Sequence, residues 1–164
     1  MNDTLNKFIG SIKALDCWYV SCGATGSTFQ LALGGKIPRT DILQNPDHTD
    51  EYRRFEGEAN LLVWCVWRLD ASDGPLTSWD DTKQGIEQGL AKLVGTRVES
   101  IDLLVPVWDL NISFSNGLTL RVFCDHVPGE PSFDGNWELW KEGKAAFVGP
   151  GTTFSIEEQP PVKS

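Results

Sequence analysis

Residues 110–122 read LNISFSNGLTLRV, and this stretch decides the fold class. Apolar and polar residues alternate on both sides of Asn116-Gly117, which is the period of a strand with one buried face. Asn-Gly between two such runs is the strongest short-range signal for a hairpin. The stretch therefore predicts two antiparallel strands, 110–114 and 118–122, joined by a type I′ turn.

A strand and a helix are predicted upstream of this hairpin. Val98–Leu104 is rich in β-branched and aliphatic residues and predicts a third strand. Asp81 and Gln84 have the spacing of a capping box, and Gly95 stands where a glycine commonly follows the last turn of a helix. The apolar stripe of this helix consists of Ile86, Leu90, Leu93 and Val94.

The central run Leu61–Leu69, LLVWCVWRL, is apolar on both faces. Such a run is typical of a central strand buried on two sides, although periodicity alone does not distinguish it from a buried helix. Asp73-Gly74-Pro75 then predicts a turn.

The N-terminal part begins with an amphipathic helix, capped by Asp3 or Thr4, whose apolar face is Leu5, Phe8, Ile9 and Ile12. A hairpin is predicted next, with strands at 17–22 and 29–33 around the turn 23–27, ending at Gly34-Gly35. Residues 36–56 are polar and without a clear period, so we expect a long surface loop, with room for a short turn of helix.

Two or three short strands are expected near the C-terminus, around Trp137–Trp140, Ala145–Val148 and Thr153–Ile156, followed by a frayed tail at 159–164. The sum predicts a single α+β domain over 1–158, with a mostly antiparallel sheet of about six to eight strands and two helices.

Cysteine usage and the N-terminal residues predict a cytoplasmic protein. The opening MNDTLNKFIGSIKAL lacks the basic head and apolar run of a secretory signal, and no run is long enough to cross a membrane. The four cysteines lie in apolar, strand-like stretches, where reduced thiols behave as small hydrophobic groups. They are Cys17, Cys22, Cys65 and Cys124.

Charge argues against nucleic acid as a partner and permits a basic protein. The net charge is −9, whereas nucleic-acid binding needs Lys and Arg to replace phosphate counterions. Residues 55–81 hold six acids against Arg68 alone, a net of −5, so this segment carries more than half of the excess. Its members, with the aromatic Trp79, are the candidate partner-binding residues: Glu56, Glu58, Asp70, Asp73, Trp79, Asp80 and Asp81.

Catalytic and metal-binding patterns are not recognisable in the chain. The two histidines, His48 and His126, lie in predicted loops or at a strand end. Cys124 and His126 are two residues apart, but the Cys and His spacings do not match those of zinc sites. Gly23–Ser27 is neither a P-loop nor a dinucleotide fingerprint. We therefore expect no catalytic residue, no metal and no cofactor.

Residues 93–123 together with Asn136–Leu139, and the pairs Gly26-Ser27 and Trp67-Arg68, resemble a family of small uncharacterised bacterial proteins. Small acidic proteins of this kind are similar to immunity proteins, which neutralise a toxin by binding it. The resemblance implies no catalytic residue.

Three functions follow as hypotheses. The first is a non-enzymatic immunity or antitoxin-like protein that occludes the active site of a basic toxin through an acidic, aromatic-containing surface. The second is a small-molecule-binding or enzymatic domain with a tryptophan-lined cleft near Cys124, Asp125 and His126. The third is a structural subunit of a larger assembly.

Overall fold

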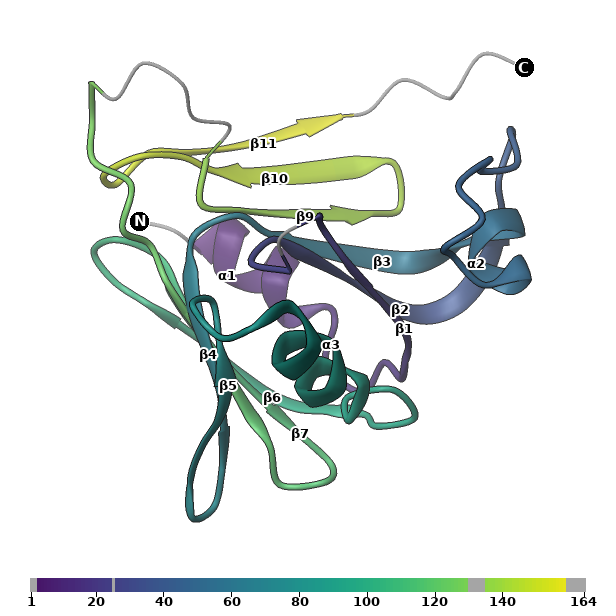
Figure 1. Cartoon of the computed structure of the whole chain (residues 1–164). Coiled ribbons are helices and arrows are strands. Elements are labelled where there is room, and N and C mark those ends of the chain that lie inside the picture. The colour runs from purple at the N-terminus through teal and green to yellow at the C-terminus, as the bar shows by residue number, and fades with distance from the viewer. Residues whose placement is uncertain (1–2, 25, 130–134, 159–164) are drawn as a thin grey trace.

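The computed structural model describes residues 3–24, 26–129 and 135–158 as an α+β fold with two antiparallel sheets (Figure 1). The predicted α+β class is confirmed. The expected counts of about six to eight strands and two helices were too low, because the described residues form eleven strands and three helices. The predicted tail at 159–164 lies outside the described residues.

Each sheet is built from neighbours that pair antiparallel. The larger sheet has the order β1-β2-β3-β9-β10-β11, with β1 (Cys17–Cys22), β2 (Phe29–Pro38), β3 (Phe55–Val63), β9 (Trp137–Lys141), β10 (Lys144–Val148) and β11 (Phe154–Glu158). The smaller sheet has the order β5-β4-β8-β7-β6, with β4 (Val66–Ala71), β5 (Gly74–Ser78), β6 (Val98–Leu104), β7 (Asp109–Phe114) and β8 (Thr119–Phe123).

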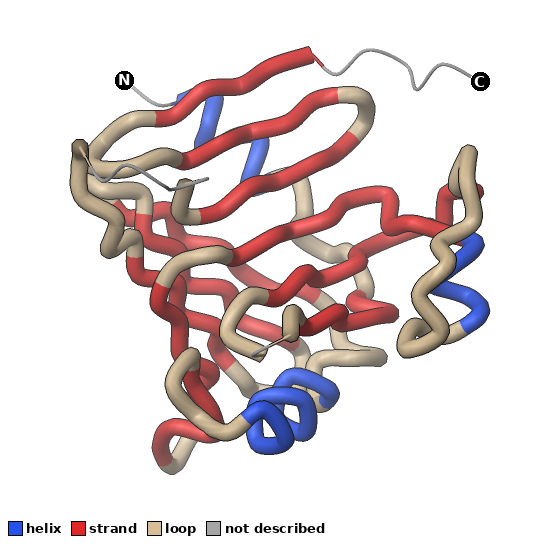
Figure 2. Tube along the Cα trace, turned by 45° about the horizontal axis from the view of Figure 1, so that its top comes forward, coloured by secondary structure: helices blue, strands red, loops and turns tan. Residues whose placement is uncertain are grey.

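Two of the helices close the space between the sheets, where the hydrophobic core lies. Helix α3 (Lys83–Ala91) contacts β5 and β1, which are edge strands of different sheets, and α1 (Asp3–Gly10) contacts β6. The short α2 (Asp50–Arg54) lies at one end of the larger sheet, away from α1 and α3 (Figure 2). The core joins both sheets to α1 and α3, and we call the side of the six-stranded sheet that faces away from this core its open face.

The predicted single strand over Leu61–Leu69 is wrong. The chain leaves the larger sheet after Val63 and enters the smaller one at Val66, and Trp64 and Cys65 donate their N–H groups to the Asn136 carbonyl at 2.9 and 3.2 Å. Odd-numbered residues from 59 to 69 are buried throughout, while Trp64 is exposed. The inward side chains therefore keep a period of two through the bend. The sequence pattern does not indicate that the chain passes from one sheet to the other here.

The predicted loop over 36–56 is also wrong at both ends, because β2 continues through Gly34-Gly35 to Pro38 and β3 begins at Phe55. The short turn of helix expected within the loop is present as α2, residues 50–54. Gly34 and Gly35 lie in a register shift of β2 against β3, which is a β-bulge. The glycine pair therefore marks a bulge inside a strand instead of its end.

The hairpin at 110–122 is confirmed, but its turn is of another type. The Gly117 N–H donates to the Phe114 carbonyl at 3.0 Å, and Gly117 has φ +85° whereas Asn116 does not have a positive φ. This is a three-residue loop with a glycine in the left-handed region, which matches a type I turn followed by a G1 bulge.

Helix termini differ slightly from the predicted caps. Thr82, and not Asp81, caps α3: its hydroxyl accepts from Gly85 N–H at 3.0 Å, while Asp81 accepts from the Thr77 hydroxyl at 2.8 Å. Val94 is exposed, whereas the rest of the predicted stripe is buried. Asp3 and Thr4 lie inside α1.

Replacing Gly89 with alanine is expected to destabilise the protein by about 2 kcal/mol, although alanine favours a helix by about 1 kcal/mol over glycine. The added Cβ would collide with the side chain of Thr77 on β5, because α3 packs on β5 at this glycine. Urea unfolding measures the difference. Gly10→Ala in α1, where a Cβ meets open space, should be neutral or stabilising; a similar gain for Gly89→Ala would contradict the expected contact.

Candidate functional site

The strand register places two rows of side chains on the open face of the six-stranded sheet. The neighbouring positions, such as Leu31, Leu61 and Leu139, point into the core, so the rows between them face away from it. One row is Ser21, Gln30, Leu62, Glu138, Phe147 and Ser155, and the other is Tyr19, Ala32, Asn60, Trp140, Ala145 and Glu157.

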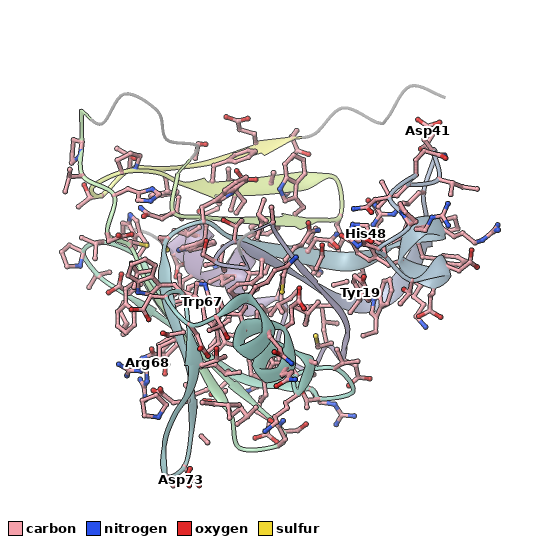
Figure 3. The ribbon with its side chains drawn as sticks, viewed as in Figure 1. Tyr19, Asp41, His48, Trp67, Arg68 and Asp73 are labelled. Carbon is pink, nitrogen blue, oxygen red and sulfur yellow. The ribbon has the colours of Figure 1, made fainter. Side chains whose placement is uncertain are left out.

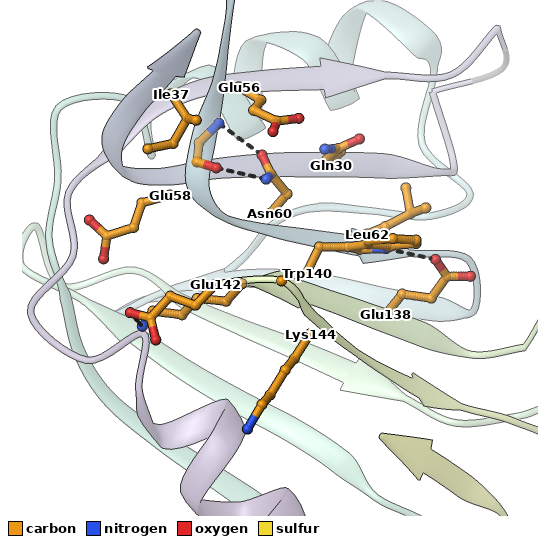
Figure 4. A pocket seen from close by; sticks show the side chains of 13 residues that line it. Gln30, Ile37, Glu56, Glu58, Asn60, Leu62, Glu138, Trp140, Glu142 and Lys144 are labelled. Atoms are coloured by element: carbon orange, nitrogen blue, oxygen red, sulfur yellow. Dashed lines mark hydrogen bonds and ion pairs between the residues drawn. The ribbon is translucent and has the colours of Figure 1, made fainter. Parts of the chain in front are cut away.

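A hollow of about 700 Å³ lies on this face, and we call it the sheet hollow (Figure 4). Its volume falls within the range of ligand and side-chain pockets in proteins. It is lined by Gln30, Ile37, Glu56, Gly57, Glu58, Asn60, Leu62, Glu138, Trp140, Lys141, Glu142, Gly143 and Lys144. Four of these are carboxylates and two are lysines, which leaves a formal charge of −2 on the lining.

The bulge in β2 shapes one side of the sheet hollow. Gly34 has φ +78°, and a Cβ there would lie 2.9 Å from the Glu58 carboxylate. That carboxylate accepts the Gly35 N–H at 3.1 Å, so the side chain satisfies a backbone group beside the bulge. Bulges bend the strand that carries them, and β2 and β3 curve together towards α2 (Figure 1). Ile37 and Glu58, on either side of this bulge, both line the sheet hollow.

Asn60 holds the adjoining part of β3. Its side-chain oxygen accepts the Gly57 N–H at 3.1 Å, and its side-chain nitrogen donates to the Gly57 carbonyl at 2.9 Å. Both strands pass so close to Gly57 that a Cβ there would lie 2.7 Å from the Leu33 nitrogen and 2.6 Å from the Ala59 carbonyl oxygen. Position 57 therefore has no room for a side chain larger than that of glycine. Its neighbours Glu56 and Glu58 line the sheet hollow.

Trp140 supplies the aromatic surface of the sheet hollow. Its indole N–H donates to the Glu138 carboxylate at 3.1 Å, and its ring meets Phe147 edge-on with centroids 5.5 Å apart. The side chain stays 36% exposed. Figure 4 shows the indole beside Leu62 and Glu138. The orientation of the ring is thus set by two neighbours, and part of its face is open.

The β9–β10 turn borders the sheet hollow. Glu142 and Gly143 both have positive φ, 52° and 73°, as a two-residue type I′ turn requires. Lys141 Nζ lies 2.6 Å from the Glu142 carboxylate and lowers the pKa of that carboxyl. A second hollow of about 320 Å³, against α1, shares this turn and is lined partly by Lys7, Phe8 and Ile156.

An aromatic cluster covers the α2 end of the same face. The rings of Tyr19 and Tyr52 stack with centroids 4.2 Å apart, and the Tyr19 hydroxyl lies 3.1 Å from His48 Nδ1. The Arg39 guanidinium lies over Tyr52, 4.6 Å from its ring centroid, and also contacts Glu56 at 3.7 Å. Burial raises the pKa of Tyr19. His48 is therefore packed into this cluster, which anchors α2 and the preceding loop beside the sheet hollow (Figure 3).

The seven predicted partner-binding residues fall into two groups. Glu56 and Glu58 line the sheet hollow. The other five lie in β4, in the β4–β5 turn and in the segment between β5 and α3, in or next to the smaller sheet; these are Asp70, Asp73, Trp79, Asp80 and Asp81. Asp73 sits at the tip of the β4–β5 hairpin, far from Tyr19 and His48 (Figure 3). The structure therefore does not bring the seven together on one surface.

Local bonds occupy most carboxylates of the second group. Asp70 accepts from Arg68 at 2.6 Å and Arg121 at 2.7 Å, and the hydrogen bond from Arg68 is the main cause that lowers the pKa of Asp70. Asp80 accepts from the Ser78 hydroxyl, and Asp81 from Thr77 and the Thr82 N–H. Trp79 is 46% exposed. These acids support turns and a cap, in addition to any contact they make outside the molecule.

Cys124, Asp125 and His126 lie near the junction of the two sheets. The Cys124 N–H donates to Asp109 at 2.6 Å, and the His126 N–H donates to the Asn136 side chain at 3.2 Å. A hydrogen bond with Cys65, burial and the nearby Asp109 raise the pKa of the Cys124 thiol, which disfavours the thiolate that acts as a nucleophile. Neither of the two hollows described above is lined by these residues.

Cys17 and Cys22 also have thiols with raised pKa values. All four cysteines are free thiols. Burial raises the pKa of Cys17 to about 12 and that of Cys22 to about 11, so both stay protonated near neutral pH. Within residues 3–24, 26–129 and 135–158, His, Cys, Asp and Glu side chains form no group of three that could hold a metal ion.

Sequence reasoning missed the residues of β9 and its turn. Glu138, Trp140 and Glu142 lie outside the acid-rich segment 55–81, and only a short strand was predicted around them. The alternation in Trp137-Glu138-Leu139-Trp140 signals that Glu138 and Trp140 share a face. Their place beside Glu56 and Glu58 follows only from the pairing of β9 with β3.

Comparison with known proteins finds no match: no family model, curated protein or solved structure matches the chain. The likeness to immunity proteins stays a prediction. None of the helices in the described part of the chain is both long and apolar enough to span a membrane.

Proposed function

We propose that this protein is a non-enzymatic binding protein that captures a basic protein partner on the open face of its six-stranded sheet. In the manner of an immunity protein, it neutralises that partner by covering its active site. The observation that carries the proposal is the sheet hollow, which four carboxylates and an exposed tryptophan line on the face that, within the described residues, points away from the core and its helices.

Charge supports a basic partner. The net charge of −9 produces a long-range field that attracts a cationic protein and speeds their encounter. Trp140, together with Leu62 and Ile37, offers the apolar contact that slows dissociation, because energetic hot spots of interfaces are rich in tryptophan surrounded by polar groups. The acids thus set the rate of encounter and the aromatic anchor sets the lifetime.

The test compares two matched triple variants. One changes the sheet hollow (Glu56→Gln, Glu58→Gln, Trp140→Ala), and the other changes the smaller-sheet side (Asp73→Asn, Asp80→Asn, Trp79→Ala). Each removes two negative charges and one exposed tryptophan. The tagged full chain is used to capture partners from cells of its source, and each partner is then purified and titrated calorimetrically.

We expect the hollow variant to bind the partner about 100-fold more weakly and the control variant within about threefold of the unchanged protein. Co-expression should show that only the hollow variant fails to relieve growth inhibition by the partner. Loss of binding in the control variant alone would place the interface on the acid-rich segment of the smaller sheet. Unchanged affinity in both variants would refute the proposed binding face.

A further inference from the structure

The indole of Trp140 is held so that only its ring face is available to a ligand. Its N–H is already bonded to Glu138 at 3.1 Å, and Phe147 lies against it edge-on at an interplanar angle of 85°. A ligand at this side chain therefore meets the π-surface and not the hydrogen-bond donor. Its neighbours in the same row are Asn60 on β3 and Ala145 on β10, and the alanine is too small to project over the ring.

The surroundings of this ring face select for positive charge. The negative face of an aromatic ring attracts cations, and the sheet hollow adds the carboxylates of Glu56, Glu58 and Glu138. Its two lysines contact carboxylates of this chain: Lys141 lies 2.6 Å from Glu142, and Lys144 lies 3.7 Å from Glu158. An anionic ligand would meet net negative charge here.

The chain already uses this combination of a cation, an aromatic ring and a carboxylate within its own fold. Arg39 lies over Tyr52 while contacting Glu56, and Arg68 lies 5.7 Å from the ring centroid of Phe123 while bonded to Asp70. Lys36 lies 5.3 Å from the ring centroid of Trp18 and 2.8 Å from Glu51. Trp140 and its carboxylates form the same arrangement without a cation over the ring among the contacts of the described residues.

Arginine suits a site made of an open ring face and nearby carboxylates better than lysine does. A guanidinium is planar and weakly hydrated, so it can stack on the indole while its edge N–H groups donate to carboxylates at the side. An ammonium group is a compact, strongly hydrated point charge and loses more solvation at the same place. At about 700 Å³, the sheet hollow has room for several side chains of one segment.

We propose that the open ring face of Trp140 is a seat for an arginine side chain of the partner, within a basic segment that lies along the sheet hollow. This inference rests on the proposed function and names the chemistry that the binding face recognises.

Indole N–H resonances test the seat directly. The full chain labelled with ¹⁵N-tryptophan is titrated with end-blocked hexa-arginine, hexa-lysine and hexa-glutamate, and Trp140→Phe assigns the Trp140 signal. We expect the Trp140 resonance to shift with hexa-arginine at a Kd of about 1 mM or tighter, about threefold or more tighter than with hexa-lysine, and not with hexa-glutamate. Glu138→Gln, which keeps an oxygen acceptor for the indole, should weaken hexa-arginine binding about threefold or more.

Trp64 and Trp79 are internal controls, because both are exposed and Trp79 lies beside Asp80 and Asp81. Equal or larger shifts of the Trp79 signal would mean that arginine peptides follow general negative charge, and would overturn the seat. So would the absence of any Trp140 shift, or equal responses to arginine and lysine. If the peptides fail while partner capture still depends on the sheet hollow, the seat is wrong and the proposed function stands.

Discussion

Asn136→Ala is expected to lower the free energy of unfolding by about 3 kcal/mol, because it removes two side-chain hydrogen bonds to partly buried backbone groups. The Asn136 side chain accepts the His126 N–H at 3.2 Å and donates to the Gly149 carbonyl at 2.8 Å, and the residue is fully buried. Its backbone carbonyl also accepts from Trp64 and Cys65 at the bend between the sheets. The asparagine thus ties the junction of the sheets to the segment after β10.

Urea unfolding of Asn136→Ala beside Asn116→Ala gives a matched comparison. The Asn116 side chain also makes two bonds to backbone, to the Lys92 carbonyl and the Leu118 N–H, but the residue is exposed and water replaces the lost partners. We expect a loss of less than about 1 kcal/mol at Asn116. Equal losses at the two positions would show that Asn136 does not hold the junction.

Gly57→Ala is expected to destabilise the protein by about 3 kcal/mol and to distort the sheet hollow at the same time. The added Cβ would lie 2.6 Å from the Ala59 carbonyl oxygen, 2.7 Å from the Leu33 nitrogen and 3.0 Å from the Asn60 side-chain oxygen. Two of these three atoms belong to the backbone, so the strands themselves must shift. Because Glu56 and Glu58 flank this position, partner binding should weaken together with stability.

Gly35→Ala, in the bulge of β2 on the opposite strand, provides the control. A Cβ there would lie 3.4 Å from the Glu58 carboxylate, an ordinary contact, and Gly35 does not need a positive φ. We expect a change of less than about 1 kcal/mol in its unfolding free energy. If Gly57→Ala unfolds at the same urea concentration as the unchanged protein, the close approach of the two strands is not maintained in solution.

Local periodicity was enough to place most of the elements. The hairpins at 17–33 and 110–122 and the helices at 3–10 and 83–91 were recognised because their apolar residues recur with the period of a strand or a helix. These patterns involve neighbours in sequence, and the side chains that form them also face the core. The α+β class follows from the same patterns.

The path of the chain between the sheets depended on tertiary structure. The inward side chains alternate without interruption from Ala59 to Leu69, so the bend at Trp64 and Cys65 has no local signal. It forms because both N–H groups find the carbonyl of Asn136, which lies far along the chain. In the same way, Gly34-Gly35 is compatible with either a strand end or a bulge until pairing with Glu58 and its neighbours decides between them.

The residues of the candidate site were also only partly predictable from the sequence. Counting charges singled out Glu56 and Glu58, because the excess of acid is visible in any window of the sequence. It also singled out Asp70 and Asp81, which the fold uses for an ion pair and for bonds beside a helix cap. It passed over Glu138 and Trp140, since only the register of β3 with β9 brings them beside Asn60 and Leu62. Residue types and their periods are properties of short segments. The neighbours of a side chain across a sheet are set instead by the pairing of strands that lie far apart in the chain. The pairing of β3 with β9 is what creates the sheet hollow.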